Sequence, residues 1–389
     1  MEERKRVKPR VRAGRRGGTD MPLVVVILGL MILGLLMIYS TSSYNAADGD
    51  QTGYLRKQLL AEALGSIGVF MILLFPYEAL KKLGRRPWRY GLLVAGAASI
   101  LLLLTPLAHS AKGATRWVQI GGLNLQPAEI VKLCLILYLA GYISENPEDI
   151  NDLKGYMKPF GVTMGAAGLI YVVSSNLSSA IIIAGIGVLM LFVASKKWVW
   201  QAITFPGIIV LASAVVLNIV RTADDVSKLN YRFKRILVWQ DPGAYLLDNG
   251  YQTLQALYAI GSGGLTGKGI GKSVQKLGTI PEVHNDMIYS VVCEELGLVG
   301  AAVIIILFGI LIFRCLMIGL SSKDSFGMLI CVGVMVHIAI QVSLNILVVT
   351  NTIPNTGVSL PFISYGGSSV LFLLAEMGLV LKVAGENAS

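Results

Sequence analysis

Three carboxylates stand out in this chain because they lie at the mouth of an apolar stretch and inside it. Asp286, Glu294 and Glu295 belong to the run PEVHNDMIYSVVCEELG at residues 281–297. A carboxylate within a membrane segment is costly, so such residues usually serve a function. The polar loop before this run adds positive charge, from Arg232, Lys234, Arg235, Lys268, Lys272 and Lys276. Acids beside a positive surface suggest chemistry on an anionic lipid.

A second cluster occupies residues 113–132, GATRWVQIGGLNLQPAEIVK. Arg116 falls in a predicted external loop, and Pro127 begins the next helix at a position where a helix tolerates proline. Glu129 and Lys132, three residues apart, then share one helix face. The pair either contacts a ligand or only neutralises two charges within the membrane. The second alternative would leave the positive charge of Arg116 unexplained.

Two further segments offer hydrogen-bonding groups. The turn SSNLSSA at residues 174–180 contains Asn176; its side chains either satisfy backbone groups between two apolar spans or bind a head group. The run GSGGLTGKGIGKS at residues 261–273 is not a P-loop, because Thr266 stands where that motif needs glycine. Its glycines still allow backbone donors and Lys268 or Lys272 to approach a phosphate, unless the run is only a flexible loop.

A fifth segment, NTIPNTGVSLPFISYGGSS at residues 351–369, contains Ser364 together with two prolines and three glycines. Irregular backbone near membrane depth is tolerated only where it is buried in protein or lines a wet cavity. The segment therefore either forms part of a cavity or rests on the membrane as an ordinary external loop.

These segments are held by a chain that is too apolar for a soluble domain, with 54% hydrophobic and 14% charged residues. Its long continuous apolar runs predict an all-α polytopic membrane protein with about ten transmembrane helices rather than a barrel. The spans are predicted at residues 21–40, 59–77, 90–106, 128–143, 160–173, 179–194, 199–220, 287–316, 326–349 and 369–384. The fifth and sixth almost touch, so one long helix is the alternative; two spans with a tight polar turn are favoured.

Basic residues predict the orientation, because Lys and Arg gather in short cytoplasmic loops. The tail at residues 1–20 and the connection at residues 81–89 are both strongly basic. Both termini are therefore expected in the cytoplasm, with the large loop at residues 222–285, between helices 7 and 8, outside. The net charge of +10 fits contact with anionic membrane lipids better than contact with nucleic acid. The four cysteines fit packing roles, and the three histidines give little support for a metal site.

Four motifs of the chain together resemble the SEDS family (shape, elongation, division, sporulation), which includes the FtsW, RodA and SpoVE proteins. The resemblance rests on residues 113–132, RILVWQDP with the following GYQTLQALYAIGSGGLTGKGIG, residues 280–300 and residues 351–369. It implies that residues 21–385 form one transmembrane glycosyltransferase domain with ten helices. It also implies a bacterial cytoplasmic membrane protein that polymerises lipid II, an undecaprenyl-pyrophosphate-linked disaccharide peptide, beside a class B penicillin-binding protein.

The resemblance also implies roles for individual residues. The essential acid of the family's H-x-D-x-I motif corresponds to Asp286, and its Q-P-x-E-x-x-K pair corresponds to Glu129 and Lys132. The arginine before tryptophan corresponds to Arg116, and the arginine before isoleucine in the long loop to Arg235. The family often has aspartate where this chain has Asn176, so any charge-dependent role at that position is in doubt.

The expected reaction is attack by a sugar hydroxyl of one lipid II on the anomeric carbon of another. A poor nucleophile and an anionic leaving group require a base and cationic or metal stabilisation. We expect Asp286 to be the base on the outer face, with Arg116, Lys132 and Arg235 on the pyrophosphate. Glu129, Lys268, Asn176 and Ser364 complete the expected substrate site, and a divalent cation, Mg2+ or Mn2+, could assist. The alternative function is transport of lipid II by a flippase, which needs no base.

Overall fold

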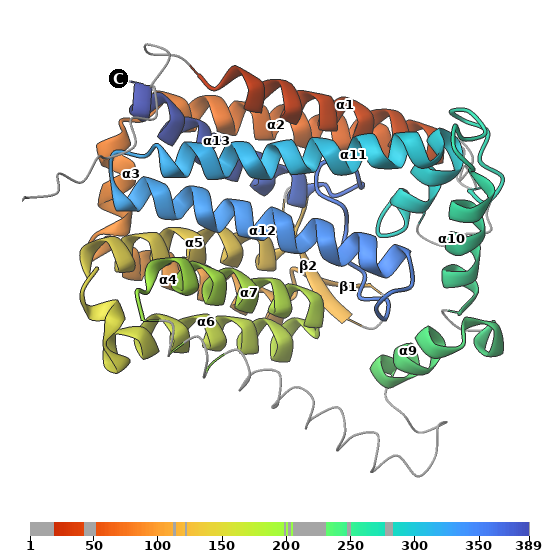
Figure 1. The fold of residues 1–389 in the computed structure, drawn as a ribbon. Helices are drawn as coiled ribbons and strands as arrows, with labels where there is room; N and C mark the ends of the chain where they lie inside the picture. Colours follow the sequence, from red (N-terminus) through yellow and green to blue (C-terminus); the bar gives the residue numbers. More distant parts are fainter. Residues whose placement is uncertain are drawn as a thin grey trace, which may run out of the picture.

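A computed structural model shows the chain as a bundle of long helices (Figure 1). The structure describes residues 19–42, 52–111, 114–120, 123–197, 200, 204, 231–246, 250–276 and 283–388. Within these ranges eight helices are long and apolar enough to cross a membrane. They are α1 (Met21–Ser42), α2 (Gly53–Leu74), α5 (Pro127–Glu145), α6 (Leu153–Ser174), α7 (Leu177–Ala194), α11 (Ile288–Leu320), α12 (Ser325–Val349) and α13 (Ser368–Ala388).

The predicted third span is the one that departs from a simple helix. Helices α3 (Tyr77–Gly84) and α4 (Trp88–Leu101) meet at an angle of 75°, with the short η2 (Leu102–Leu104) continuing α4. Pro76 and Pro87 lie at the two helix starts, where the missing N–H of proline costs nothing. Counted as one broken span, the pair gives up to nine spans among the described residues. The predicted seventh span, residues 199–220, lies almost entirely outside those residues.

The prediction of two separate spans at residues 160–194 is confirmed by α6 and α7. The chain reverses at Ser175, whose φ of +52° is in the left-handed region. Asn176 then caps α7, its side chain accepting a hydrogen bond from Ser179 N at 3.1 Å. The polar turn thus satisfies backbone groups that the end of one helix and the start of the next leave open.

Helices α5, α12 and α13 form the inner part of the bundle. Most of their residues are buried inside the protein, whereas in α2, α6 and the most apolar stretch of α11 only about a quarter are buried. The outer helices turn large apolar side chains outward, among them Phe70, Val172 and Ile306. This arrangement suits a bundle whose surroundings are hydrocarbon, and it leaves the inner helices to carry buried polar residues.

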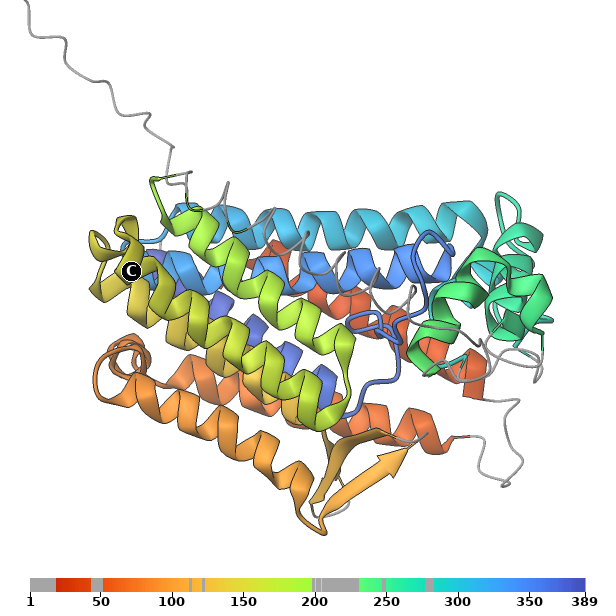
Figure 2. The ribbon, with the colours of Figure 1, turned by 90° about the horizontal axis from the view of Figure 1, so that it is seen from below.

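The bundle has two distinct ends (Figures 1 and 2). At one, the terminal end, the start of α1 and the C-terminus lie near α3; there Asp20 pairs with Arg314. Asp324, which caps α12, receives hydrogen bonds from Tyr77 and Lys81 at this end. Burial opposes ionisation of Asp324, but the bonds from Lys81, the backbone of Gly327 and Tyr77 bring its pKa below the ordinary value.

The other end, the loop end, carries the connections between helices. Helices α9 (Tyr231–Gln240) and α10 (Gly250–Ser262), with η5 (Pro242–Tyr245) between them, stand beside it. A small antiparallel sheet, in the order β1 (Ala108–Ala111), β2 (Ala114–Ile120), β3 (Leu123–Leu125), leads directly into α5. Val118 is its buried anchor and pairs with Ala108 on one side and Leu125 on the other. The sequence predicted only a folded-back loop here, because strands this short are stabilised by their surroundings.

Candidate active site

The irregular segment between α12 and α13, residues 350–367, is the centre of the loop end. Most of residues 358–364 are buried, and Phe362 and Gly357 have positive φ values of 62° and 68°. Buried irregular backbone needs hydrogen-bond partners, and side chains supply them. Asn345 donates to Val358 O at 2.7 Å and Gln341 to Ser359 O at 3.1 Å. The segment is therefore an integral part of the bundle rather than an external loop resting on a membrane, and its role in lining a cavity stays a prediction.

Three elements far apart in the sequence meet this segment at residues 355–357. Arg235 of α9 donates from Nη1 to Asn355 O at 2.9 Å. Ser178, in the first turn of α7, donates to Thr356 O. The carboxylate of Asp286 lies beside Gly357, where a methyl group would be only 3.8 Å from Asp286 Oδ2. The structure thus brings the predicted acid and one predicted cation to the same short stretch of backbone.

Asp286 stands just before α11, in the half-buried segment that precedes the cap residue Met287. Its backbone carbonyl accepts a hydrogen bond from Asn345 at 2.9 Å. Two residues earlier, the carbonyl of His284 accepts one from Tyr365 N at 2.9 Å. The ring of His284 is enclosed by Tyr54 and Tyr365, at centroid distances of 4.2 and 5.8 Å. The chain around the acid is consequently held from several sides.

The predicted pair on α5 lies deeper in the bundle. Lys132 Nζ is 2.8 Å from Glu129 Oε1, and both side chains are almost fully buried. The ammonium also contacts His337 Nε2 at 2.9 Å and donates to Gln341 Oε1 at 3.4 Å. On its other side His337 Nδ1 is 2.7 Å from Glu376 of α13. The predicted pair is thus part of a larger buried network that joins α5, α12 and α13.

The remaining predicted site residues fall into different places. Arg116 is half-buried on β2, in the sheet that leads into α5. Ser364 accepts a hydrogen bond from Leu360 N at 2.8 Å and so helps to fold its own segment. Asn176 acts as the cap of α7, next to Ser178. The structure therefore places all three residues at the loop end, where Ser364 and Asn176 stabilise the local backbone.

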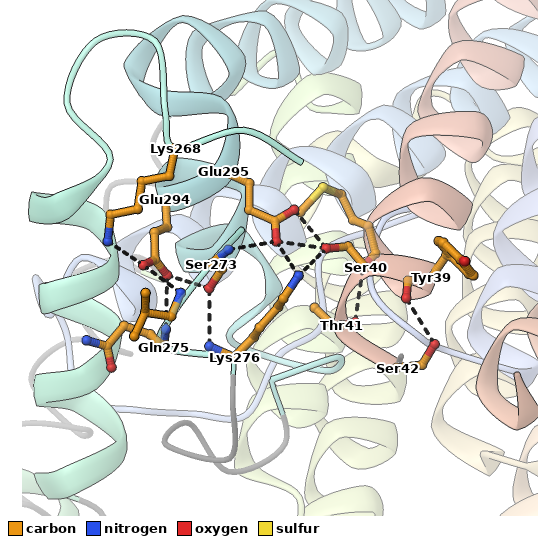
Figure 3. Close-up of polar contacts among 12 residues, drawn as sticks. Tyr39, Ser40, Thr41, Ser42, Lys268, Ser273, Gln275, Lys276, Glu294 and Glu295 are labelled. Carbon is orange, nitrogen blue, oxygen red and sulfur yellow. Dashed lines mark hydrogen bonds and ion pairs between the residues drawn. The ribbon is translucent and has the colours of Figure 1, made fainter. Parts of the chain in front are cut away.

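Lys268 lies in a separate cluster, which Figure 3 shows in close-up. Its ammonium is 2.7 Å from Glu294 and donates to Ser262 at 2.9 Å. Beside it, the buried Lys276 lies 2.7 Å from Glu295 and donates to Ser40 of α1 at 2.8 Å. We call the two lysine–glutamate pairs the double clamp. It attaches the glycine-rich segment, residues 263–276, to α11 and α1.

The double clamp lies next to a break in α11. Gly297 has φ +68° and ψ −168°, so the helix is interrupted there. The glycine-rich segment supplies the missing backbone partners. Lys268 N and Gly269 N donate to the carbonyls of Glu294 and Glu295 at 2.9 Å, and the N–H groups of the next two helix residues, Leu298 and Val299, donate to Gly264 O and Leu265 O at 2.9 and 3.1 Å. The two glutamates that suggested catalysis therefore help to attach the glycine-rich segment to α11 and α1.

No group of three or more His, Cys, Asp or Glu side chains suited to a metal ion occurs within the described ranges. At residues 355–357 the described contacts offer one carboxylate, that of Asp286, and backbone carbonyls. Mg2+ is commonly held by one or two carboxylates together with substrate phosphates, so Asp286 would supply one ligand to such an ion; no step of the reaction proposed for this site runs through a metal.

Sequence reasoning missed His337, Gln341, Asn345, Glu376 and Ser178. A signal for three of them was present, because His337, Gln341 and Asn345 recur every fourth residue in an otherwise apolar helix. That spacing places polar groups on one helix face. Their partners, however, lie on α5 and α13 and in the irregular backbone before α11 and after α12.

The chain is similar to known proteins along almost its whole length. A family model described as cell cycle protein, for FtsW, RodA and SpoVE, matches residues 21–389. Stage V sporulation protein E of Bacillus subtilis is 35% identical over 374 residues, which cover 95% of this chain and 98% of that protein. The probable peptidoglycan glycosyltransferase FtsW of Trichlorobacter lovleyi is 34% identical over 368 residues, covering 94% and 93%.

Solved structures share the fold. One chain, from a structure that describes the structural coordination of polymerization and crosslinking by a peptidoglycan synthase complex, matches with a TM-score of 0.76 at 27% identity. The match covers 94% of this chain and 98% of that one. The crystal structure of the Rod shape determining protein RodA of Thermus thermophilus matches with a TM-score of 0.64 at 26% identity, covering 94% and 97%.

Proposed function

The chain belongs to the FtsW, RodA and SpoVE family of cell cycle proteins, and from that premise we propose that it is a peptidoglycan glycosyltransferase that polymerises lipid II. Several relatives carry the name probable peptidoglycan glycosyltransferase FtsW, at 31% to 35% identity. The apolar helices make the chain a multi-pass membrane protein. We place it in the bacterial cytoplasmic membrane, with both termini in the cytoplasm and the loop end outside.

The observation that carries this proposal is the meeting of Asp286 and Arg235 at residues 355–357. A sugar hydroxyl of one lipid II attacks the anomeric carbon of the other lipid-linked glycan, forming the new C–O bond. The bond from that carbon to the pyrophosphate breaks, and undecaprenyl pyrophosphate leaves with the bonding electron pair. Asp286 accepts the hydroxyl proton as general base. A base and a cation on one short segment are what this reaction requires.

The proposal gives the cations near the loop end different roles toward the pyrophosphate. Arg235 contacts the same stretch of backbone as the acid, and a planar guanidinium suits phosphate oxygens. Lys132 lies deeper and connects to the same segment through Gln341 and Ser359. We assign it, with Arg116 on the neighbouring sheet, to the field that stabilises the departing pyrophosphate.

We also propose that a class B penicillin-binding protein docks on the outer face of α11. Val299, Val303, Ile306, Ile310 and Phe313 form an exposed apolar stripe along that helix. Their spacing of three and four residues keeps them on one face. A single membrane helix of the partner fits such a stripe, and the similarity to a chain from a peptidoglycan synthase complex supports the pairing.

The test is polymerisation of labelled lipid II by the purified protein with its transpeptidase. Asp286→Asn keeps the shape but removes the proton acceptor, which typically lowers the rate about a hundred- to ten-thousandfold. Asp241→Asn is the matched control, since Asp241 only caps η5 at an exposed position. Near-parental activity of Asp286→Asn would refute the assignment of the base. Movement of lipid II across vesicles by a parent protein that never polymerises it would favour the flippase.

A further inference from the structure

Helix α12 carries a row of polar side chains that the proposed reaction does not use. His337, Gln341 and Asn345 are at most 3% exposed, and each lies one turn from the next on the same face. Buried polar groups in an apolar helix are costly unless they are hydrogen-bonded. His337 and Gln341 belong to the network around Lys132, whereas Asn345 reaches the segment that holds Asp286.

The side-chain amide of Asn345 connects two irregular backbone segments on opposite sides of the site. Its Nδ2 donates to Asp286 O at 2.9 Å and to Val358 O at 2.7 Å. Both acceptors are carbonyls, so the nitrogen, rather than the oxygen, must face them. Among the described residues the buried Oδ1 of Asn345 has no hydrogen-bond partner. The residue therefore retains one unsatisfied polar atom, a cost that the two bonds from Nδ2 have to offset.

These two bonds connect the backbone of the acid to the irregular segment. Asp286 Oδ2 is beside Gly357, and Val358 is the next residue along. The amide of Asn345 thus holds the backbone on both sides of the contact between Asp286 and Gly357. The bond from Tyr365 N to His284 O holds the preceding residues, but within the described contacts it does not reach Asp286 itself.

We propose that Asn345 is a positioning residue for glycosyl transfer, which holds Asp286 and the segment at residues 356–358 in register so that the carboxylate faces the attacking hydroxyl. This inference rests on the proposed function, since it assumes that Asp286 is the base. Small misplacements of a reacting group are costly, on the order of a hundredfold for about 1 Å. Loss of the amide should therefore lower kcat, while KM for lipid II changes little.

The experiment compares three variants in the polymerisation assay, with rates expressed per folded protein after size-exclusion chromatography. Asn345→Leu removes the donor at every pH. Asn345→Asp restores one O–H donor only when the acid is protonated, because an ionised carboxylate donates nothing. Thr163→Val is the control, since Thr163 is equally buried and donates only within its own helix.

We expect Asn345→Leu to lower kcat about ten- to a hundredfold, with KM within about threefold and no effect of Thr163→Val. The ratio of kcat for Asn345→Asp to that of the parent should rise as the pH falls, whereas the ratio for Asn345→Leu stays flat. A purely structural residue would lower the yield without this pH signature. Unchanged kcat, a flat ratio for Asn345→Asp, or failure of both variants to fold would overturn the proposal. If instead Asp286→Asn polymerised lipid II normally, the proposed function itself would be at fault.

Discussion

Removal of Lys276 should destabilise the protein far more than removal of Lys268, although both lysines belong to the double clamp. The side chain of Lys276 is 3% exposed and that of its partner Glu295 is fully buried. Lys276→Met would leave that carboxylate buried with only neutral donors, Ser40 and a backbone N–H. Removing one partner of a buried ion pair costs about 3–5 kcal/mol.

Lys268→Met provides the matched comparison. The Lys268 side chain is 34% exposed, and Glu294 keeps hydrogen bonds from Ser273, Val274 N and Gln275 N after the lysine is gone. Glu294 is itself fully buried, but three donors remain on its carboxylate and the lost ammonium was partly exposed, so the cost should be smaller than for a fully buried pair. The free energy of unfolding should therefore fall several times less than for Lys276→Met.

Equilibrium unfolding of the detergent-solubilised protein, followed by helical circular dichroism, measures both effects. The double variant Lys276→Met/Glu295→Met should regain most of the lost stability, because it leaves no unpaired buried charge at this position. Folded Lys276→Met should still polymerise lipid II at a rate near that of the parent. Equal losses for the two lysines, or no recovery in the double variant, would refute the reasoning; a stable but inactive Lys276→Met would assign the clamp to catalysis.

Two further predictions concern charges elsewhere in the bundle. The double variant Lys132→Met/Glu129→Gln removes both charges of the α5 pair and should fold, yet polymerise lipid II about a hundredfold more slowly; recovery of parental rates would make the pair structural. Asp324→Asn keeps the cap of α12 but removes its charge. Because the folded-state pKa of Asp324 is lowered, its contribution to stability is present above the unfolded pKa of about 3.9 and is lost as the pH falls through the folded pKa. Asp324→Asn should therefore lower the unfolding temperature at pH 7, and the difference from the parent should shrink below about pH 4; a difference that stayed constant would mean that the charge of Asp324 does not stabilise the fold.

Hydropathy predicted the helical bundle well because the apolar runs are long and continuous. The start of α2 shows its limit: the helix begins at Gly53, although the predicted span began at residue 59. The first turns contain Arg56 and Lys57, which an apolar span excludes but a helix accommodates. In the same way, the short strands around Arg116 have no apolar run of their own, so hydropathy did not predict them.

The candidate site was predictable residue by residue only where a motif named the residue. Asp286, Arg235, Glu129 and Lys132 were predicted in this way, and the structure places the first two at one segment. The partners of Glu294 could not be predicted, because they are contributed by a loop 19 to 26 residues earlier. Such pairings depend on how a loop folds back, which neither spacing nor composition records.

The break in α11 has a consequence for how the chain is made. The backbone partners of the broken turn come from residues 264–269, which are synthesised before the helix that they complete. An added methyl group at Gly267 would lie 2.2 Å from Glu295 O, so only glycine allows the two backbones to meet there. Because the ribosome releases the complementary segment first, the interrupted helix can receive its partners as it emerges. Its open carbonyls then never have to face lipid alone.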